Sequence, residues 1–381
     1  MANTRTNIAT LLLPTVFFGY AIYANSALLL SADPRADMLP AGDFSLLNVI
    51  DGATTRDLDA LYKNELPHRA SSVGIVGNAR YALLGAGRKG VVIGDDGWLF
   101  TDEEFKRIKA SDIEDAVARI GKVREELQER GIELVVVPLP AKSDVYAEHL
   151  PSMMKTEYMA QAYRDFFAGL EKSGMTVVDT RSALIDAKTG GDLFLPSDTH
   201  WTPAGAKVTA QAVQMTVERA GLALSATQIS GEQEASVNVW GDLTKFITSP
   251  DYAPEIGLKP ENVAIFRTVA TTAADSTDIF GGDSTVPVML VGTSYSANEN
   301  WCFADYLRQS LSVDVVNVAK EGLGPGVPML ELIDSDVLDQ APPSIMVWEF
   351  PVRYLGKGAL WRRKDSGETG GHHTGAGESN V

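Results

Sequence analysis

The chain has 381 residues, with 33 Lys and Arg against 50 Asp and Glu, which gives a formal net charge of −17. A nucleic-acid-binding surface needs clustered cations that displace counterions from phosphates, and the sequence has no stripe dense in Lys or Arg, so this class of partner is excluded. With 45% hydrophobic and 22% charged residues, the chain can bury a sizeable core. Its one cysteine, Cys302, excludes an intramolecular disulfide and a paired-cysteine zinc site.

The chain begins with an apolar segment. No charged side chain occurs from Thr6 to Ala32, and Ile8–Leu30 is long enough to cross a bilayer, which takes about 20 apolar residues. Arg5 precedes this run and Asp33 follows it, a charge bias that keeps the N-terminus in the cytoplasm. We therefore expect a signal anchor over residues 1–32, with the body on the periplasmic side of the inner membrane. A cleaved signal peptide is the alternative, because Ala24-Asn25-Ser26 resembles a processing site.

Two further segments flank the main body. Residues 33–85 are polar and mixed, with helical runs at 56–64 and 73–84, and we interpret them as a membrane-proximal helical arm. Residues 361–381 lack apolar periodicity, so we expect a disordered tail. His372 and His373 lie in this tail, and two neighbouring histidines do not make a closed metal site. The main domain is then expected at 86–360.

In the main body, amphipathic helices alternate with short apolar runs. Helices are expected at 113–129, 158–173, 203–220 and 298–311, and buried strands at 91–93, 134–139, 175–179, 286–291, 313–318 and 344–349. Near-continuous apolar strands separated by helices are typical of a parallel sheet covered on both faces. The sequence thus predicts an α/β fold, a three-layer α/β/α domain with a mostly parallel sheet. Ligands of such sheets bind at the carboxyl ends of the strands.

The stretch Leu193–Ala206 carries the first candidate site residues. Thr202 is a natural helix N-cap and Pro203 suits the first helical position, so Asp198 and His200 lie on the loop just before a helix. An acid two positions away can orient the His200 imidazole as a general base. The alternative is that His200 is a satisfied polar residue without a chemical role.

A general base needs a nucleophile, and Ser294 is the best candidate because it follows the apolar run 286–291. A serine at a strand-to-helix turn exposes its hydroxyl at the carboxyl edge of the sheet, where helix amides can hold an oxyanion. Ordinary turn chemistry is the alternative. Gly282-Asp283-Ser284 is rejected as a nucleophile motif because it precedes the strand. After the next strand, the glycine-rich loop 317–326 offers further backbone amides.

Taken together, the motifs resemble the SGNH-hydrolase-like polysaccharide O-acetyltransferases of the AlgJ and AlgX kind, most closely the AlgJ branch. The resemblance covers most of the chain. It rests on the N-terminal apolar run and on the blocks Tyr81–Phe100, Pro140–Lys142, Ser197–Trp201, Gly241–Leu243, Gly292–Tyr295 and Val347–Tyr354.

The resemblance implies that Ser294 is the nucleophile, His200 the base and Asp198 the residue that orients the base. In ordinary SGNH enzymes the serine comes first in the chain, so this order is permuted. The resemblance also pairs the Gly322 amide with the Ser294 amide in an oxyanion hole. The strand end Trp348-Glu349 takes the place of the family's usual asparagine block.

Four more residues are candidates for oxyanion or substrate binding: Tyr295, Lys142, Trp201 and Arg353. An acidic protein and a polyuronate repel each other, and a locally basic groove that uses Lys142, Arg353 or Lys320 could offset this repulsion. The alternative for each of these cations is an exposed side chain that only solubilises the protein. No metal and no soluble cofactor is required. Few residues follow position 360, so we expect no carbohydrate-binding module of the AlgX type.

The implied function is an O-acetyltransferase of alginate biosynthesis that passes an acetyl group through Ser294 to mannuronate hydroxyls. The implied partners are a membrane-bound O-acyltransferase that supplies the acetyl group, the polysaccharide acceptor, and other alginate-acetylation proteins. Three alternatives remain at this point: a periplasmic acetylesterase, a non-catalytic scaffold of a polysaccharide-acetylation complex, and acylation of cellulose or another exopolysaccharide.

Overall fold

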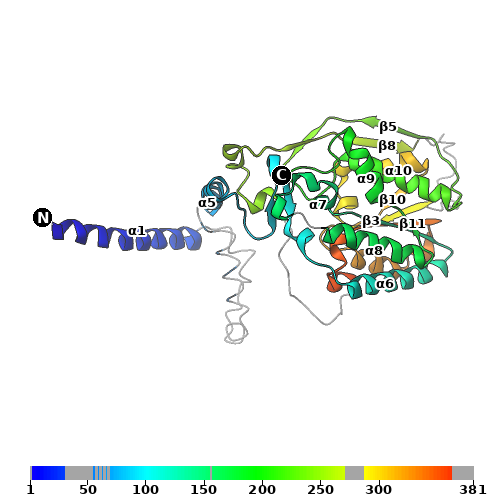
Figure 1. Cartoon of the computed structure of the whole chain (residues 1–381), viewed down its shortest axis with the longest axis horizontal. Helices are drawn as coiled ribbons and strands as arrows, with labels where there is room; N and C mark the ends of the chain where they lie inside the picture. The colour runs from blue at the N-terminus through cyan, green and yellow to red at the C-terminus, as the bar shows by residue number, and fades with distance from the viewer. Residues whose placement is uncertain are drawn as a thin grey trace.

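The structure, a computed structural model, describes residues 2–30, 69–154, 157–270 and 287–362, together with positions 55, 59, 62 and 66. The Gly282–Ser284 turn, most of the arm before residue 69 and the tail beyond residue 362 lie outside these residues, and so do His372 and His373. Helix α1 (Ala2–Leu30) projects from one end of the domain (Figure 1). In the described part of the chain, no helix combines the length and the apolar character needed to cross a membrane.

Five parallel strands form the central sheet. Their spatial order is β10 (Val315–Asn317), β9 (Val288–Val291), β11 (Ile345–Pro351), β3 (Glu133–Leu139) and β4 (Thr176–Val177). The longest pairing joins β11 to β3 over their whole lengths. Each strand coincides with an apolar run of the sequence, so the predicted α/β fold with a mostly parallel sheet is confirmed.

Helices cover both faces of this sheet, as Figure 1 shows. One face carries α6 (Ala110–Gln128), α8 (Tyr158–Lys172) and α13 (Gly326–Ile333), and the other carries α9 (Thr180–Ala187), α10 (Pro203–Arg219) and α12 (Phe303–Leu311). Side chains alternate along a strand, so Val135 and Val137 of β3 enter one core while Leu134 and Val136 enter the other. The carboxyl edge of the sheet is thus fixed from both sides.

Shorter elements surround the carboxyl edge. The antiparallel pairs are β1 (Val91–Ile93) with β2 (Leu99–Thr101), β5 (Ile229–Gln233) with β8 (Phe266–Ala270), and β6 (Val237–Val239) with β7 (Glu261–Val263). Short helices are α7 (Lys142–Val145), α11 (Ser294–Ala297) and α14 (Val337–Gln340). The sequence did not predict β5, because this strand is exposed along most of its length and so lacks apolar alternation.

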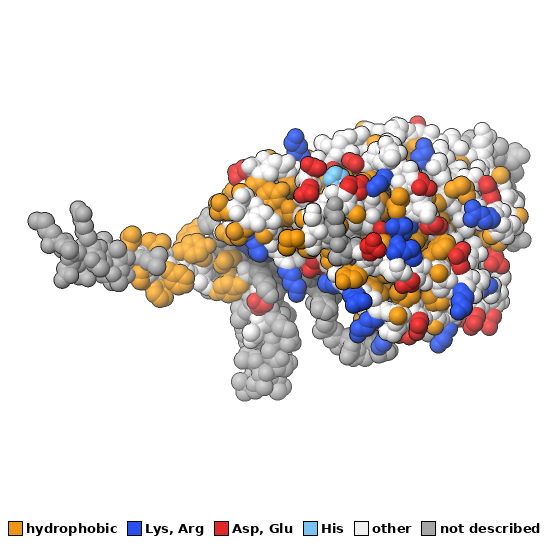
Figure 2. All heavy atoms as spheres, viewed as in Figure 1, with side chains coloured by type: hydrophobic (Ala, Val, Ile, Leu, Met, Phe, Trp, Pro, Cys, Tyr) orange, Lys and Arg blue, Asp and Glu red, His pale blue; other side chains and the backbone are white. Residues whose placement is uncertain are grey.

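One described helix precedes the sheet. This is α5 (Arg69–Leu84), which includes the predicted helical run at 73–84. It packs against the segment 247–255, where Asn78 Nδ2 donates to the Tyr252 carbonyl at 2.9 Å. Figure 2 shows charged side chains of both signs over the domain, and hydrophobic side chains gathered on α1 and around α5.

The start of α10 depends on a close backbone approach. The Thr202 hydroxyl accepts from the Gly205 amide at 3.2 Å, which confirms the predicted cap. A Cβ added at Gly205 would lie 2.2 Å from the Leu193 carbonyl oxygen. Glycine is therefore required for the loop 193–202 to pass beside its own helix.

We predict that Gly205→Ala lowers the free energy of unfolding by about 1–3 kcal/mol, the usual range for overpacking. The matched control is Gly190→Ala, because a Cβ at the exposed Gly190 meets nothing within 4 Å. Urea denaturation of both variants measures the difference. Equal midpoints for the two variants would contradict the packing described for Gly205.

Candidate active site

A chain of short hydrogen bonds links Asp198, His200 and Ser294. His200 Nδ1 lies 2.6 Å from the Asp198 carboxylate, and the His200 amide donates to the same oxygen at 2.8 Å. On the other side of the ring, His200 Nε2 lies 2.7 Å from Ser294 Oγ. Ser294 as a whole residue is half-buried. This geometry allows the imidazole to take the serine proton while the carboxylate fixes the ring.

The turn between β9 and α11 positions the nucleophile. Thr293 caps α11, and its amide and hydroxyl each donate to the Glu349 carboxyl group at 3.0 Å. The Ser296 hydroxyl donates to the same carboxyl group at 2.7 Å. The Ser294 amide is the first N–H of α11, and no carbonyl of its own helix can accept from it. This amide can therefore stabilise an oxyanion.

Glu349 supports the nucleophile turn, residues 292–296. Its side chain is fully buried, and both carboxyl oxygens are used as acceptors by Thr293 and Ser296. Burial raises the pKa of Glu349, while the hydrogen bonds from Ser296 and Thr293 oppose that rise. The interpretation that the strand end Trp348-Glu349 takes the place of the asparagine block stays a prediction, and the hydrogen bonds of Glu349 go to the nucleophile turn. A Cβ at Gly292 would lie 2.5 Å from Glu349 Oε2, so a glycine at this position lets the Glu349 carboxyl group reach Thr293 and Ser296.

Asp242 holds the catalytic loop, residues 195–200, from the side opposite Ser294. Its amide donates to Asp198 Oδ2 at 2.8 Å. Its carboxylate accepts from the Thr199 amide and from the Thr199 hydroxyl, each at 2.8 Å. Sequence reasoning gave Asp242 no role, although Gly241-Asp-Leu243 was one of the blocks behind the family resemblance.

The hydrogen-bonded chain Asp198–His200–Ser294 is called the relay below. Burial and neighbouring charges shift the pKa values of Asp198 and His200 in opposite directions. Burial tends to raise the pKa of Asp198, but the His200 charge and the hydrogen bonds from His200 and Asp242 lower it to about 2. Burial tends to lower the pKa of His200, but the Asp198 and Asp242 carboxylates raise it. Burial and the Asp198 charge raise the pKa of Asp242. Asp198 is thus ionised at neutral pH and stabilises the imidazolium that forms during proton transfer.

Asp198, His200 and Asp242 also place one possible metal-ligand atom each within 4.8 Å of one another. Such nitrogen and oxygen donors are of the kind that binds zinc. In this site, however, both oxygens of Asp198 and both oxygens of Asp242 accept hydrogen bonds from protein donors. The donor set is arranged for the proton relay and not for a cation.

Lys142 lies beneath the catalytic loop and not in a surface groove. Its side chain is only 1% exposed, and Nζ lies 2.6–2.8 Å from the carbonyl oxygens of Leu99, Leu195, Pro196 and Asp198. The rings of Trp98 and Phe100 lie beside the ammonium. Burial lowers the pKa of Lys142 to about 8, although nearby carboxylates, Glu104 first, oppose this. Lys142 is therefore not an exposed cation of a basic groove. Its buried ammonium binds backbone carbonyls and holds the catalytic loop in place.

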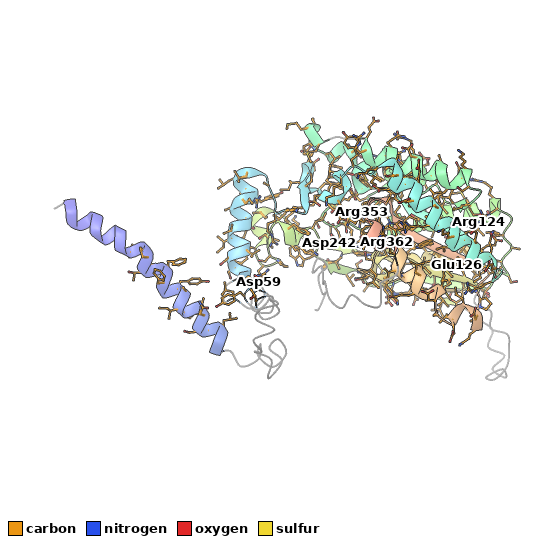
Figure 3. The ribbon with its side chains drawn as sticks, turned by 90° about the horizontal axis from the view of Figure 1, so that it is seen from below. Asp59, Arg124, Glu126, Asp242, Arg353 and Arg362 are labelled. Atoms are coloured by element: carbon orange, nitrogen blue, oxygen red, sulfur yellow. The ribbon has the colours of Figure 1, made fainter. Side chains whose placement is uncertain are left out.

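The other predicted binding residues are also largely buried. Trp201 is 0% exposed and donates from Nε1 to the Tyr295 carbonyl at 3.1 Å. The buried Tyr295 hydroxyl donates to the Thr199 carbonyl and accepts from Arg353 Nη1 at 3.0 Å. This network ties the catalytic loop to the nucleophile turn, so Trp201 and Tyr295 act as supports and offer no exposed surface to a substrate. Figure 3 shows Arg353 and Asp242 in the same region of the domain.

Gly322 lies in the exposed loop after β10, with a φ of +73° that favours glycine. This loop touches the nucleophile turn where the Lys320 amide donates to the Gly292 carbonyl at 3.2 Å. The Lys320 ammonium pairs with Glu331 on the surface. Among the described residues, no hydrogen bond joins Gly322 to Ser294, and the role of Gly322 as an oxyanion donor stays a prediction.

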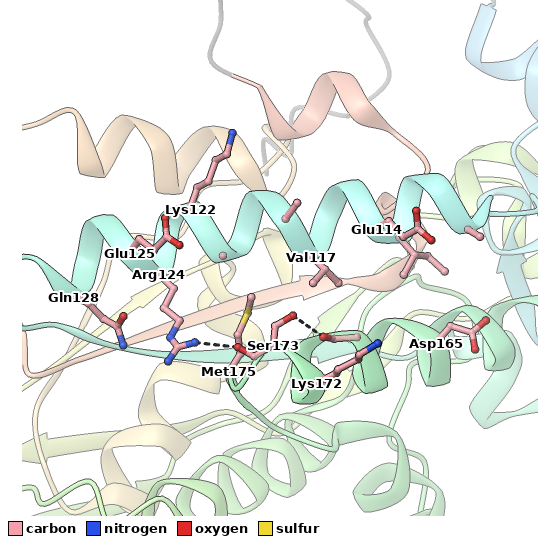
Figure 4. Close-up of a pocket in the computed structure, with 15 residues that line it drawn as sticks. Glu114, Val117, Lys122, Arg124, Glu125, Gln128, Asp165, Lys172, Ser173 and Met175 are labelled. Atoms are coloured by element: carbon pink, nitrogen blue, oxygen red, sulfur yellow. Dashed lines mark hydrogen bonds between the residues drawn. The ribbon is translucent and has the colours of Figure 1, made fainter.

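A surface groove of about 890 Å³ lies between α6 and α8 (Figure 4). Charged side chains of both signs line it, and Arg124 donates to the Ser173 carbonyl across it at 3.1 Å. None of Asp198, His200 and Ser294 is among its lining residues. The groove is therefore separate from the acyl-transfer site.

Comparison with known proteins assigns the family. A family model described as "SGNH hydrolase-like domain, acetyltransferase AlgX" matches residues 91–352. The "Probable alginate O-acetylase AlgJ" of Pseudomonas aeruginosa is 37% identical over 83% of this chain and 82% of its own length. The chain belongs to the AlgJ/AlgX family. The predicted resemblance is thus confirmed, and membership makes this protein an acyltransferase with an SGNH hydrolase-like fold.

Solved structures of AlgJ/AlgX proteins agree with this assignment. The O-acetyltransferase domain of Pseudomonas putida AlgJ has 36% identity and a TM-score of 0.63, covering 74% of this chain and 96% of that domain. Pseudomonas aeruginosa AlgX has 25% identity and a TM-score of 0.56, covering 72% of this chain and 69% of that one. The region matched by the family model, residues 91–352, contains all three relay residues, Asp198, His200 and Ser294.

We predict that Asp242→Asn lowers the pKa of His200, because it removes one of the two carboxylates that raise it. A general base works above its pKa, so the acidic limb of kcat/KM should move to lower pH. The direction of the shift is the prediction, because a nearby negative charge favours the protonated imidazole and its removal disfavours it. The control is Asp96→Asn, since the Asp96 side chain is 82% exposed. A shift to higher pH, or one equal to that of the control, would contradict the proposed electrostatics.

We predict that Lys142→Met lowers the free energy of unfolding by about 3–5 kcal/mol, as for removal of one partner from a buried charged network. It should also lower kcat more than tenfold at a temperature where the protein stays folded, because the catalytic loop loses the ammonium that binds its carbonyls. Lys106→Met is the control, since that side chain is 61% exposed. A destabilised variant with wild-type kcat would show that Lys142 has no influence on the relay.

Proposed function

We propose that this protein is an O-acetyltransferase of exopolysaccharide biosynthesis that moves acetyl groups through Ser294 to mannuronate hydroxyls of alginate. The observation that carries the proposal is the relay from Asp198 through His200 to Ser294, at 2.6 Å and 2.7 Å. The name of the Pseudomonas aeruginosa relative, a probable alginate O-acetylase, supports the choice of acceptor.

In the first half-reaction, Ser294 Oγ forms a bond to the acetyl carbonyl carbon of the donor while His200 Nε2 takes the serine proton. The carbonyl oxygen becomes negatively charged, and a fixed amide such as that of Ser294 stabilises it by about 3–4 kcal/mol. The bond between the acetyl group and the donor then breaks. His200 returns the proton to the leaving atom, and an acetyl-Ser294 ester remains.

In the second half-reaction, an acceptor hydroxyl gives its proton to His200 and attacks the acetyl carbon of the ester. The bond to Ser294 Oγ breaks, and His200 returns the proton to the serine. The acceptor leaves as an O-acetyl sugar and the enzyme regains its starting state. Water in the place of the sugar hydroxyl would give acetate, which is the acetylesterase reaction.

We further infer that residues 1–32 anchor the protein in the inner membrane, with the catalytic domain on the periplasmic side. The uncharged run Ile8–Leu30 supports this, and large apolar side chains of α1 such as Val16, Phe17 and Ile22 are 61–69% exposed. The same proposal includes a membrane-bound O-acyltransferase that supplies the acetyl group, and other alginate-acetylation proteins as partners.

The test supplies the full-length protein with an activated acetyl ester and mannuronate oligosaccharides, and follows O-acetylated sugar by mass spectrometry. We expect transfer by the wild type, a loss of at least 10³-fold in Ser294→Ala, as expected for removal of a catalytic nucleophile, and no change in the exposed control Ser152→Ala. Release of acetate without any acetylated sugar would contradict the transferase and favour the esterase. Equal rates for wild type and Ser294→Ala would contradict the site itself.

A further inference from the structure

The outer face of α5 is apolar although it is exposed. Ile75, Val76 and Leu83 are 58%, 66% and 81% exposed, and Leu84 at the helix end is 72% exposed. With 3.6 residues per turn, Ile75, Val76, Ala79 and Leu83 fall on one stripe of the helix. Contiguous apolar side chains at the surface of a helix mark a contact with another phase or molecule.

The opposite face of α5 is already used within the protein. A Cβ at Gly77 would lie 2.0 Å from the Ile247 carbonyl oxygen, so the helix is seated directly on the segment 247–255. Asn78 Nδ2 also donates to Glu255 at 3.1 Å. The apolar stripe therefore points away from the domain and cannot be buried by a rotation of the helix.

The charge around α5 is opposite to that of the whole chain. From Leu66 to Gly94 there is no Asp or Glu, and the segment contains Arg69, Arg80, Arg88 and Lys89, while the chain as a whole carries −17. All four of these cations are exposed. On the helix, Arg69 and Arg80 lie at one edge of the apolar stripe, where long side chains can reach anionic groups while the stripe is immersed.

Helix α5 lies near the proposed N-terminal anchor, so it is placed to make a second contact with the same membrane. Figures 1 and 3 both place α5 at the end of the domain from which α1 projects. The segment that seats α5 also leads back to the active site, because the Leu243 amide donates to the Ser197 carbonyl at 3.2 Å. The chain that seats α5 is thus tied, a few residues earlier, to the catalytic loop.

We propose that α5 lies in the plane of an anionic lipid bilayer, with Ile75, Val76 and Leu83 in the headgroup region and the flanking cations on lipid phosphates. A helix with an apolar face and basic edges binds bilayers in this way. This inference rests on the membrane attachment in the proposed function, and it adds a docking surface that holds the domain in a fixed orientation. The carboxyl edge of the sheet would then face a membrane-borne acetyl donor.

The test uses the full-length protein in the Cys302→Ser background, which removes its one native thiol. A single cysteine is placed at Val76 or Leu83 and labelled with an environment-sensitive fluorophore. The matched control is Met215→Cys, at a 54% exposed position on α10. The protein is reconstituted into phosphatidylglycerol vesicles, and quenching by lipid-borne spin labels and by aqueous iodide is measured. Flotation of the same vesicles and ester turnover are recorded in parallel.

We expect lipid quenching at positions 76 and 83 to exceed that at 215 at least threefold, and to fall in the double variant Arg69→Gln/Arg80→Gln.

Protein that floats and turns over ester, but is quenched by iodide equally at all three positions, would overturn the α5 contact and leave the anchor and the catalytic proposal intact. A blue-shifted signal at 76 without lipid quenching would indicate a protein partner and would also overturn it. Protein that does not float contradicts both membrane contacts, whereas lost turnover alone concerns only the catalytic proposal.

Discussion

The active site depends on how the buried ammonium of Lys142 holds the loop 195–200, which has no helix or strand of its own. Three of the four carbonyls around Nζ belong to this loop, those of Leu195, Pro196 and Asp198. Backbone carbonyls grouped around one charge cannot separate without leaving that charge unpaired in the interior, which is costly. Asp198 is therefore fixed from below by Lys142, while the amide of Asp242 fixes its carboxylate from the side.

The turn that carries the nucleophile is fixed in a comparable way by a buried carboxyl group. Glu349 at the end of β11 accepts three hydrogen bonds from the turn that carries Ser294. The Tyr295 side chain joins the two halves, because its hydroxyl contacts the Thr199 carbonyl and Arg353. A preorganised site of this kind holds its dipoles in place before the reaction starts. These buried charged and polar residues near Ser294 and His200 thus serve the geometry of the site.

The strands of the central sheet, most helices and the relay residues were predictable from the sequence because their signals are local. Apolar runs mark buried strands, and Thr202-Pro203 marks a helix start beside Asp198 and His200. The roles of Lys142, Asp242 and Glu349 were not predictable, because each depends on contacts with residues far away in the chain. A lysine near a motif suggests a surface cation, and burial of its ammonium becomes visible only when the carbonyls around it are in place. The exposed strand β5 was missed for a different reason, because its sequence has no apolar alternation.

The central claim is that Ser294 becomes a covalent carrier of the acetyl group. The most direct measurement is a rapid quench of the full-length protein with an activated acetyl ester in the absence of sugar, followed by peptide mass spectrometry. The account predicts acetyl on the peptide that contains Ser294, its disappearance when acceptor oligosaccharide is added, and its absence in His200→Ala. Turnover of the ester with no acetyl on Ser294, or acetyl that persists when acceptor is present, would contradict the account.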